Sequence, residues 1–148
     1  MVAGVSGYLL DTNVVSELMK RRPSRHVTEW VETTSEELMH LSVMTIGEIR
    51  KGIDLIDQDE PRRAALQSWL DHDLRVRFAG RLLAFDDGVA ERWGQLEAIA
   101  KRQRVTLPTI DAQLAATALH HGLTFVTRNT ADIRATGVPV FNPWSHRA

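Results

Sequence analysis

The chain has 148 residues, of which 43% are hydrophobic, so it can bury a normal core and we expect a single domain over residues 1–148. It has no cysteine, which excludes disulfides, thiolate metal sites and cysteine nucleophiles. The formal net charge of −1 gives no general sign of nucleic-acid binding. No apolar run is long enough to cross a bilayer and residues 1–7 lack the pattern of a signal peptide, so we expect a cytoplasmic protein without membrane association.

Short strand-like segments alternate along the chain with longer segments of helical periodicity. The strand candidates are residues 7–10, 38–42, 82–85, 124–127 and 138–141. The helix candidates are residues 14–20, 24–33, 45–56, 61–77, 87–104 and 108–121. This alternation predicts an α/β fold in which helices cover both faces of a mostly parallel sheet of four to five strands.

The first predicted strand ends at an acidic residue. Asp11 follows residues 7–10 and comes directly before an apolar-periodic helix. A carboxylate at the carboxyl end of a strand lies in the crevice where α/β sheets bind ligands. Asp11 could instead serve only as the cap of the helix, although Thr12 and Asn13 could also cap it. Both roles stay open for Asp11 on the sequence alone.

The predicted helix 45–56 carries a second acid beside its buried face. Its apolar stripe consists of Ile46, Ile49, Ile53 and Ile56. Glu48 lies on the adjoining face with Thr45 and Gly52, so we expect it at the edge of the buried side; taken alone, it would be an ordinary exposed helix charge. Gly47 and Gly52 each lower helix propensity by about 1 kcal/mol and suggest a close backbone approach at this helix.

The predicted helix 108–121 and the strand 124–127 bring further polar residues to the same edge of the sheet. Pro108 suits the first turn of a helix, and Asp111 follows three residues later. Asp111 could simply complement the helix dipole. Asn129 and Asp132, which follow the strand, could be ordinary turn residues. We expect all three near Asp11 and Glu48, because each follows a strand or begins a helix.

An acidic cluster of this kind predicts a metal site. Like charges in one place destabilise a fold unless a cation or a proton neutralises them. Carboxylate ligands favour hard cations such as Mg²⁺ or Mn²⁺. A divalent metal can activate water for attack on phosphorus and stabilise the anionic transition state of phosphodiester hydrolysis. Motifs for other chemistries are missing, since the sequence has no HExxH, GxGxxG, Walker or GxSxG pattern.

Four motifs in order along the chain resemble one known family. They are LLDTNVVSE at 9–17, TIGEIRKG at 45–52, IDAQLAATA at 110–118 and VTRNTAD at 126–132. Together they resemble the PIN-domain ribonucleases, specifically the VapC toxins and their FitB-like branch, and VFNPW at 140–144 is also similar to that branch. The resemblance covers nearly the whole chain.

The resemblance implies a three-layer α/β/α sandwich and a Mg²⁺- or Mn²⁺-dependent endoribonuclease. It also implies the toxin of a type II toxin–antitoxin system, blocked by a cognate VapB- or FitA-like antitoxin, and a homodimer. By motif matching, Asp11 and Asp111 would be the principal metal ligands and Glu48 would complete the site directly or through water. Hydrogen bonds from four neighbours would support these ligands, namely Thr12, Asn13, Thr45 and Thr127.

The sequence departs from the family pattern at one position of the site. The fourth family position, often Asp, is Asn129 here. An amide can coordinate a cation or orient water but supplies no negative charge, so a weakened second metal site follows as a hypothesis. Asp132, three residues later, could substitute in part. We expect the change Asn129→Asp to test this hypothesis by metal titration.

Two other functions and two surface features are left open by the residues. A phosphatase or phospho-accepting receiver also places Asp at a strand end, and a covalent aspartyl phosphate would reveal it. A non-catalytic metal- or partner-binding module would keep the acids only for folding, and calorimetry would show no metal binding. Local groups of Lys and Arg form either solvated helix faces or contacts to an RNA backbone. The four tryptophans belong either to the core or to a dimer or antitoxin surface.

Overall fold

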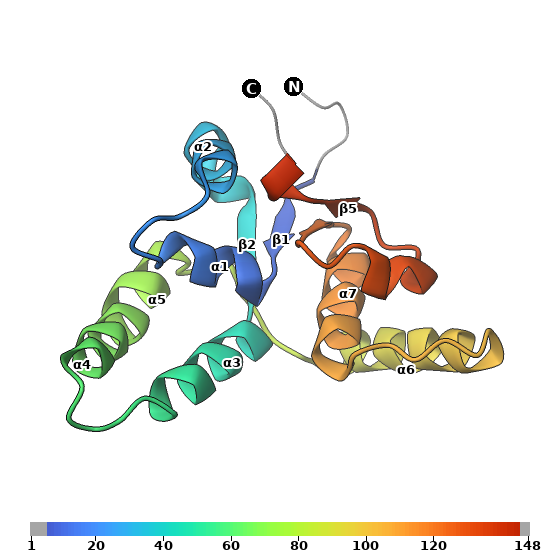
Figure 1. Cartoon of the computed structure of the whole chain (residues 1–148). Helices are drawn as coiled ribbons and strands as arrows, with labels where there is room; N and C mark the ends of the chain where they lie inside the picture. Colours follow the sequence, from blue (N-terminus) through green and yellow to red (C-terminus); the bar gives the residue numbers. More distant parts are fainter. Residues whose placement is uncertain (1–5, 146–148) are drawn as a thin grey trace.

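The centre of the molecule is a five-stranded parallel sheet. The computed structural model describes residues 6–145. The strands are β1 (Tyr8–Leu10), β2 (Met39–Ser42), β3 (Leu82–Leu83), β4 (Thr124–Val126) and β5 (Val140–Phe141). Their order is β3-β2-β1-β4-β5, and every neighbouring pair is parallel (Figure 1). The predicted α/β class, strand number and strand direction are confirmed.

Helices cover both faces of this sheet and make it the middle of three layers (Figure 1). One face carries α1 (Thr12–Leu18), α2 (Arg25–Thr33), α3 (Val43–Asp54), α4 (Pro61–Ser68) and α5 (Arg75–Arg77). The other face carries α6 (Asp87–Arg102) and α7 (Thr109–His121). Short turns complete the chain: the 3₁₀ helices η1 (Glu36–Leu38), η3 (Ala131–Thr136) and η4 (Pro143–Ser145), and the π-helical turn η2 (Trp69–Leu74).

The strands β1 and β4 are mostly apolar because both of their faces are buried. Leu10 and Val126 belong to the core beneath α1, α2 and α3, whereas Leu9 and Phe125 belong to the core beneath α6 and α7. Successive strand residues point to opposite faces, so each strand contributes to both cores. This double burial holds the ends of β1 and β4 in fixed positions.

Four helices, α1, α2, α3 and α6, begin where a side chain accepts a free N–H group of the first turn. Ser24 accepts from the Val27 N–H at 3.4 Å, and Ser42 accepts from the Met44 N–H at 3.0 Å. α3 therefore begins at Val43, two residues earlier than predicted. At the other helix ends, the predicted and observed boundaries differ by no more than two residues. None of the helices within residues 6–145 is long and apolar enough to cross a membrane.

Two predictions about helices need correction. The predicted single helix 61–77 is helical throughout but is interrupted by the π-helical turn η2, which puts Leu70 and Leu74 into the core. The suggested close approach at Gly47 and Gly52 is wrong, because an added Cβ would have no neighbouring atom within 4 Å at either position. A close approach occurs instead at Gly88, where an added Cβ would lie 2.5 Å from Cε1 of His120.

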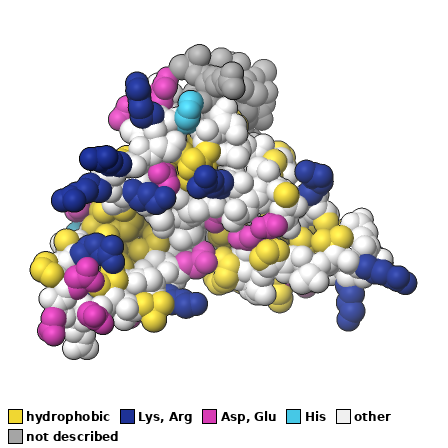
Figure 2. Space-filling view, viewed as in Figure 1, with side chains coloured by type: hydrophobic (Ala, Val, Ile, Leu, Met, Phe, Trp, Pro, Cys, Tyr) yellow, Lys and Arg dark blue, Asp and Glu magenta, His cyan; other side chains and the backbone are white. Residues whose placement is uncertain are grey.

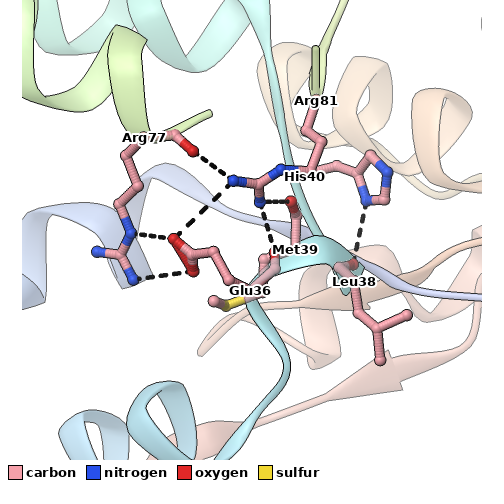
Figure 3. A network of polar contacts seen from close by, with 6 residues as sticks. All are labelled: Glu36, Leu38, Met39, His40, Arg77 and Arg81. Carbon is pink, nitrogen blue, oxygen red and sulfur yellow. Dashed lines mark hydrogen bonds and ion pairs between the residues drawn. The ribbon is translucent and has the colours of Figure 1, made fainter. Parts of the chain in front are cut away.

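The amino-terminal edge of the sheet is held by a network of charged groups (Figure 3). The Arg81 guanidinium donates to the carbonyl oxygens of Glu36 and Met39, and Arg77 binds the carboxylate of Glu36. The bond from Arg77, with help from Arg81, lowers the pKa of Glu36 against the opposing effect of burial. These charges tie η1 and β2 to the segment that leads into β3. They lie at the edge of the sheet opposite the predicted acidic site.

Candidate active site

Asp11 lies at the carboxyl end of β1, next to the end of β4. Its N–H donates to the Val126 carbonyl oxygen at 2.9 Å, which extends the pairing of the two strands. Its carboxylate accepts the Thr12 N–H at 2.7 Å and the Thr127 hydroxyl at 2.6 Å. Only 4% of Asp11 is exposed. Asp11 therefore caps α1, and the same side chain stands in the crevice at which the strand order reverses.

Glu48 reaches the same crevice from the second turn of α3. The Thr12 hydroxyl donates to Oε1 of Glu48 at 2.5 Å and lies 3.2 Å from the hydroxyl oxygen of Thr45. Thr45 is fully buried, whereas Glu48 is half-buried. The Thr12 side chain therefore joins α1 to α3 and holds the Glu48 carboxylate toward Asp11.

Thr127 organises the other side of Asp11. While its hydroxyl donates to Asp11, the same oxygen accepts the Asn129 N–H at 3.0 Å and lies 3.4 Å from the Asn13 amide nitrogen, which donates to it. Oδ1 of Asn13 is buried and has no hydrogen-bond partner within residues 6–145. A buried acceptor without a partner costs free energy, so a cation or a water molecule would satisfy it.

Asp111 stands in the first turn of α7, which begins at the same edge of the sheet. Its pKa is raised from 3.8 to about 6, first by burial and then by the charges of Asp11, Asp132 and Glu48. Burial also raises the pKa of Asp11, against the hydrogen bonds from Thr127 and Thr12, and the Glu48 charge adds to the rise. Four acids from four separate segments thus repel one another at one place, an arrangement that a cation would stabilise.

The donor set fits a hard divalent cation, but the acids are not closed around one. Carboxylate, hydroxyl and amide oxygens are the ligands that Mg²⁺ and Mn²⁺ prefer. Within residues 6–145, no three Asp, Glu or His side chains form an arrangement ready to hold a metal ion. The carboxylates of Asp11 and Glu48 are bound to Thr127 and Thr12 instead. A carboxylate that accepts a hydrogen bond keeps further lone pairs for a cation, so these bonds can orient both side chains as ligands.

The two predicted residues after β4 are more exposed than the other members of the site. Asn129 contacts the cluster through its backbone N–H, and its side chain is exposed. Asp132 is exposed in the first turn of η3, yet its charge contributes to the raised pKa of Asp111. Asp132 is thus electrostatically coupled to the acid cluster.

Two grooves flank Glu48, and the sequence did not indicate either of them. One has a volume of about 840 Å³ and runs between α1, α3 and α4; we call it the α1–α3–α4 groove. The other has a volume of about 550 Å³ and lies on the opposite side of α3, beside Ile110. Thr12, Glu48 and Gly52 line both. The first groove is also lined by Ser16 and by three members of the Lys and Arg groups, Lys20, Arg21 and Arg62.

The fold and this acidic crevice are those of a known family. Residues 8–138 match the family model of the PIN domain, and the chain belongs to that family. The family resemblance based on the four motifs is confirmed. Ribonucleases with this domain generally depend on a divalent metal ion.

Named relatives cover nearly the whole chain. The chain is 38% identical to "Toxin FitB" of Neisseria gonorrhoeae over 92% of its own length and 97% of that protein. It is 36% identical to "VapC ribonuclease Y4jK" of Sinorhizobium fredii over 92% of its length and 96% of that protein.

Solved structures agree with these relatives. A crystal structure of FitAcB from Neisseria gonorrhoeae superposes with a TM-score of 0.89 and 37% identity, covering 94% of this chain and 99% of the other. A toxin–antitoxin complex from Klebsiella pneumoniae contains a chain with 28% identity and a TM-score of 0.63, covering 93% of this chain and 98% of the other.

Proposed function

We propose that this protein is a divalent-metal-dependent endoribonuclease that hydrolyses RNA phosphodiester bonds and acts as the toxin of a type II toxin–antitoxin pair. The observation that carries the proposal is the convergence of acids from β1, α3, α7 and η3 in the crevice of a PIN domain. The pKa of Asp111 is raised to about 6, first by burial and then by the charges of the other three acids. The names of relatives more than 35% identical over nearly the whole chain, a toxin and a ribonuclease, support the same function.

Each residue of the site has a distinct part in this proposal. Asp11 and Asp111 hold the cation, and Glu48 binds it directly or through water. Thr127 fixes the orientation of the Asp11 carboxylate, and Thr12 does the same for Glu48. When bound, the cation supplies the charge that lowers the pKa of a nearby water and stabilises the anionic transition state.

The supporting residues and the identity of the cation follow from the same contacts. Thr45 packs behind the Thr12 hydroxyl, and Asn13 offers its unpartnered Oδ1 to the cation or its water. All of these donors are oxygen atoms, so Mg²⁺ is the first choice and Mn²⁺ the second. An RNA substrate also implies action in the cytoplasm.

A cognate VapB- or FitA-like antitoxin would block this site. The relative named as a toxin and the toxin–antitoxin complex of similar fold support such a partner.

The half-buried Trp69 and Trp144 leave apolar surface that either the antitoxin or a second copy of the chain could cover. We infer a homodimer in solution, which size measurement of the purified chain would test.

Purified protein should cleave single-stranded RNA in the presence of Mg²⁺ or Mn²⁺ and lose cleavage in a chelator. Asp11→Asn and Asp111→Asn should each reduce kcat by more than about 100-fold, because each removes a metal-holding charge. Glu91→Gln on the exposed face of α6 removes the same charge far from the site and should cleave like the unchanged protein. Circular dichroism would check that the variants fold.

Unchanged cleavage in both Asp variants would refute the assignment of the site. A covalent aspartyl phosphate formed from phosphoryl donors would favour a phosphatase instead, although both Asp11 oxygens accept hydrogen bonds and are poorly placed for attack. A calorimetric titration without metal binding would favour a non-catalytic module.

Asn129 leads to a separate prediction about a second cation. We infer that the second metal site is weak, because the amide of Asn129 supplies no charge and Asp132 compensates only in part. Asn129→Asp should tighten metal binding by roughly tenfold and lower the metal concentration that gives half-maximal cleavage. Calorimetry and cleavage at graded Mg²⁺ would measure both. Identical titrations for the two proteins would rule out a role for this position.

A further inference from the structure

The α1–α3–α4 groove begins at the acidic site and leads away from it. Thr12 and Glu48 lie at one end, and Ile53, Ile56 and Leu66 are among the apolar residues that line it farther along. Glu48 is the only acid among its lining residues, whereas Lys20, Arg21 and Arg62 supply three cations. Figure 2 shows hydrophobic surface bordered by Lys and Arg side chains over α1 and α4.

Two of these cations are not neutralised by any residue in the range 6–145. Lys20 forms an ion pair with Glu17 at 2.8 Å. Arg63, the neighbour of Arg62, donates to the Ile56 carbonyl oxygen and pairs with an acid on α3. Arg21 and Arg62 form no ion pair with any residue in the range 6–145, and both are exposed. Guanidinium groups of this kind bind phosphate through two parallel hydrogen bonds.

Gly52 makes room beside Glu48. It sits within α3, where glycine weakens a helix relative to alanine, and it lines both grooves. Its backbone does not require glycine, and an added Cβ would meet no atom within 4 Å. Neither the helix nor its packing therefore explains the missing side chain. The glycine leaves an open passage across α3, four residues after the acid.

These three observations point to the path of the substrate. We propose that a single RNA strand lies along the α1–α3–α4 groove and crosses α3 at Gly52, with phosphates held by Arg21 and Arg62. Unpaired bases lie against the apolar residues of the groove and against Trp69, which also lines it. The inference rests on the proposed ribonuclease function and adds to it the residues that bind the strand away from the cut. A protein segment would leave the two arginines without a matching anion unless it were acidic.

The charge part of the inference is tested by binding, in a chelator so that the RNA stays intact. The probe is a fluorescent single-stranded oligoribonucleotide, and anisotropy gives Kd at several salt concentrations. Arg21→Ala and Arg62→Ala should each weaken binding about fivefold at 0.1 M salt and reduce the log–log salt slope by about 0.7. Arg22→Ala and Arg92→Ala remove exposed arginines outside the groove and should leave the salt slope unchanged.

The steric part is tested with two glycines of the same kind. Gly52→Gln puts a side chain into the passage, whereas Gly94→Gln puts the same side chain on the exposed face of α6, where an added Cβ also meets no atom within 4 Å. Both changes should raise the midpoint of thermal unfolding, because glutamine is the better helix former. Only Gly52→Gln should weaken RNA binding, by about fivefold or more.

The outcomes separate this inference from the proposed function. If the protein cleaves RNA but the arginine variants and Gly52→Gln bind it normally, the strand lies elsewhere and the inference is wrong, while the nuclease function stands. If those variants lose RNA binding but the unchanged protein cleaves nothing with Mg²⁺ or Mn²⁺, the groove is correct and the proposed function fails. If only a synthetic Glu-rich peptide depends on the arginines, the groove binds protein and the inference is overturned.

Discussion

At the scale of single residues, the Asp11 carboxylate is held between opposing effects. Burial favours its protonated form, whereas hydrogen bonds from Thr127 and Thr12 favour the charged form. A metal ligand must be ionised, so the hydrogen bond from Thr127 serves the proposed chemistry as well as the fold. The β4 strand carries this threonine to Asp11 across 116 positions of the chain.

Replacing Thr127 by valine should therefore affect both stability and activity. The change keeps the shape of the side chain but leaves one oxygen of a buried carboxylate without a donor, which costs about 1–3 kcal/mol. The pKa of Asp11 should rise further, so the pH at which cleavage reaches half its maximum should also rise. Chemical denaturation and a pH profile of kcat would measure the two effects.

Thr117→Val is the matched control for this change. Thr117 is equally buried, but its hydroxyl donates to the Gln113 carbonyl within α7, far from the acid cluster. Its loss should leave the pH profile unchanged. A shifted profile in both variants would mean that the Thr127 effect is a general result of destabilisation.

At the scale of elements, the short helix α1 is held at both ends by buried acids. Asp11 caps its beginning, and Glu17, only 5% exposed, accepts the Ser24 N–H at 2.8 Å and pairs with Lys20. The hydrogen bond from Lys20 is the main reason that the pKa of Glu17 is lowered. The motif at 9–17 thus positions Thr12 by fixing the helix that carries it. The sequence pattern contains both acids but does not show that Asp11 is the candidate ligand and that Glu17 only stabilises the end of the helix.

The helix α3 shows which features of an element its sequence can predict. Ile46, Ile49 and Ile53 of the predicted stripe are buried as their spacing predicts. The fourth member, Ile56, lies beyond the end of α3 and is half-buried. Glu48 stands at the edge of that face, also as predicted. The reason for Gly52 could not be read from the sequence, because a glycine at a tight contact and a glycine beside an open groove look identical in the chain.

The segment 61–77 was predicted as one helix because its apolar residues recur at roughly helical spacing. The π-helical turn η2 adds a residue to one turn, which brings Leu70 and Leu74 into the core and leaves Asp73 exposed. Local propensity does not favour this turn. It follows from packing against the neighbouring helices.

At the scale of the whole molecule, the site lies where the ends of strands and the beginnings of helices come together. All five strands run in the same direction, so the ends of β1 and β4 and the beginnings of α3 and α7 lie at one edge (Figure 1). Neutralising the four acids gathered there would take the formal net charge from −1 to +3. The remaining surface is then suited to a polyanion, which the bulk composition conceals.

This gathering of charge should make the stability of the metal-free protein fall as pH rises. The folded chain binds a proton at Asp111 up to about pH 6, whereas the unfolded chain releases it near 3.8. Folding is therefore less favourable above pH 6 than near pH 4 as far as this group is concerned, and Asp11 acts in the same direction. Thermal unfolding between pH 4.5 and 8 in a chelator would measure the trend.

Mg²⁺ and the variant Asp111→Asn should each weaken that trend. The cation should raise the unfolding midpoint more at pH 7.5 than at pH 5, because protons compete for the same carboxylates. Asp111→Asn should be more stable than the unchanged protein at pH 7.5 without metal and should gain little from Mg²⁺. Glu17 and Glu36 have lowered pKa values, so their stabilising contributions are lost mainly as pH falls below about 4.5, outside the window. Parallel pH curves for the two proteins would contradict the prediction.

The sequence by itself determined the α/β class, the succession of strands and helices along the chain, and the acids brought to one edge of the sheet. It could do so because periodicity, capping residues and strand ends are local properties of the chain. Only the tertiary structure decided that Thr127 bonds to Asp11, that Thr12 holds Glu48, and that Arg21 and Arg62 line the same groove. Those relations join positions far apart in the chain, and packing of the helices on the sheet, which no local pattern encodes, brings them together.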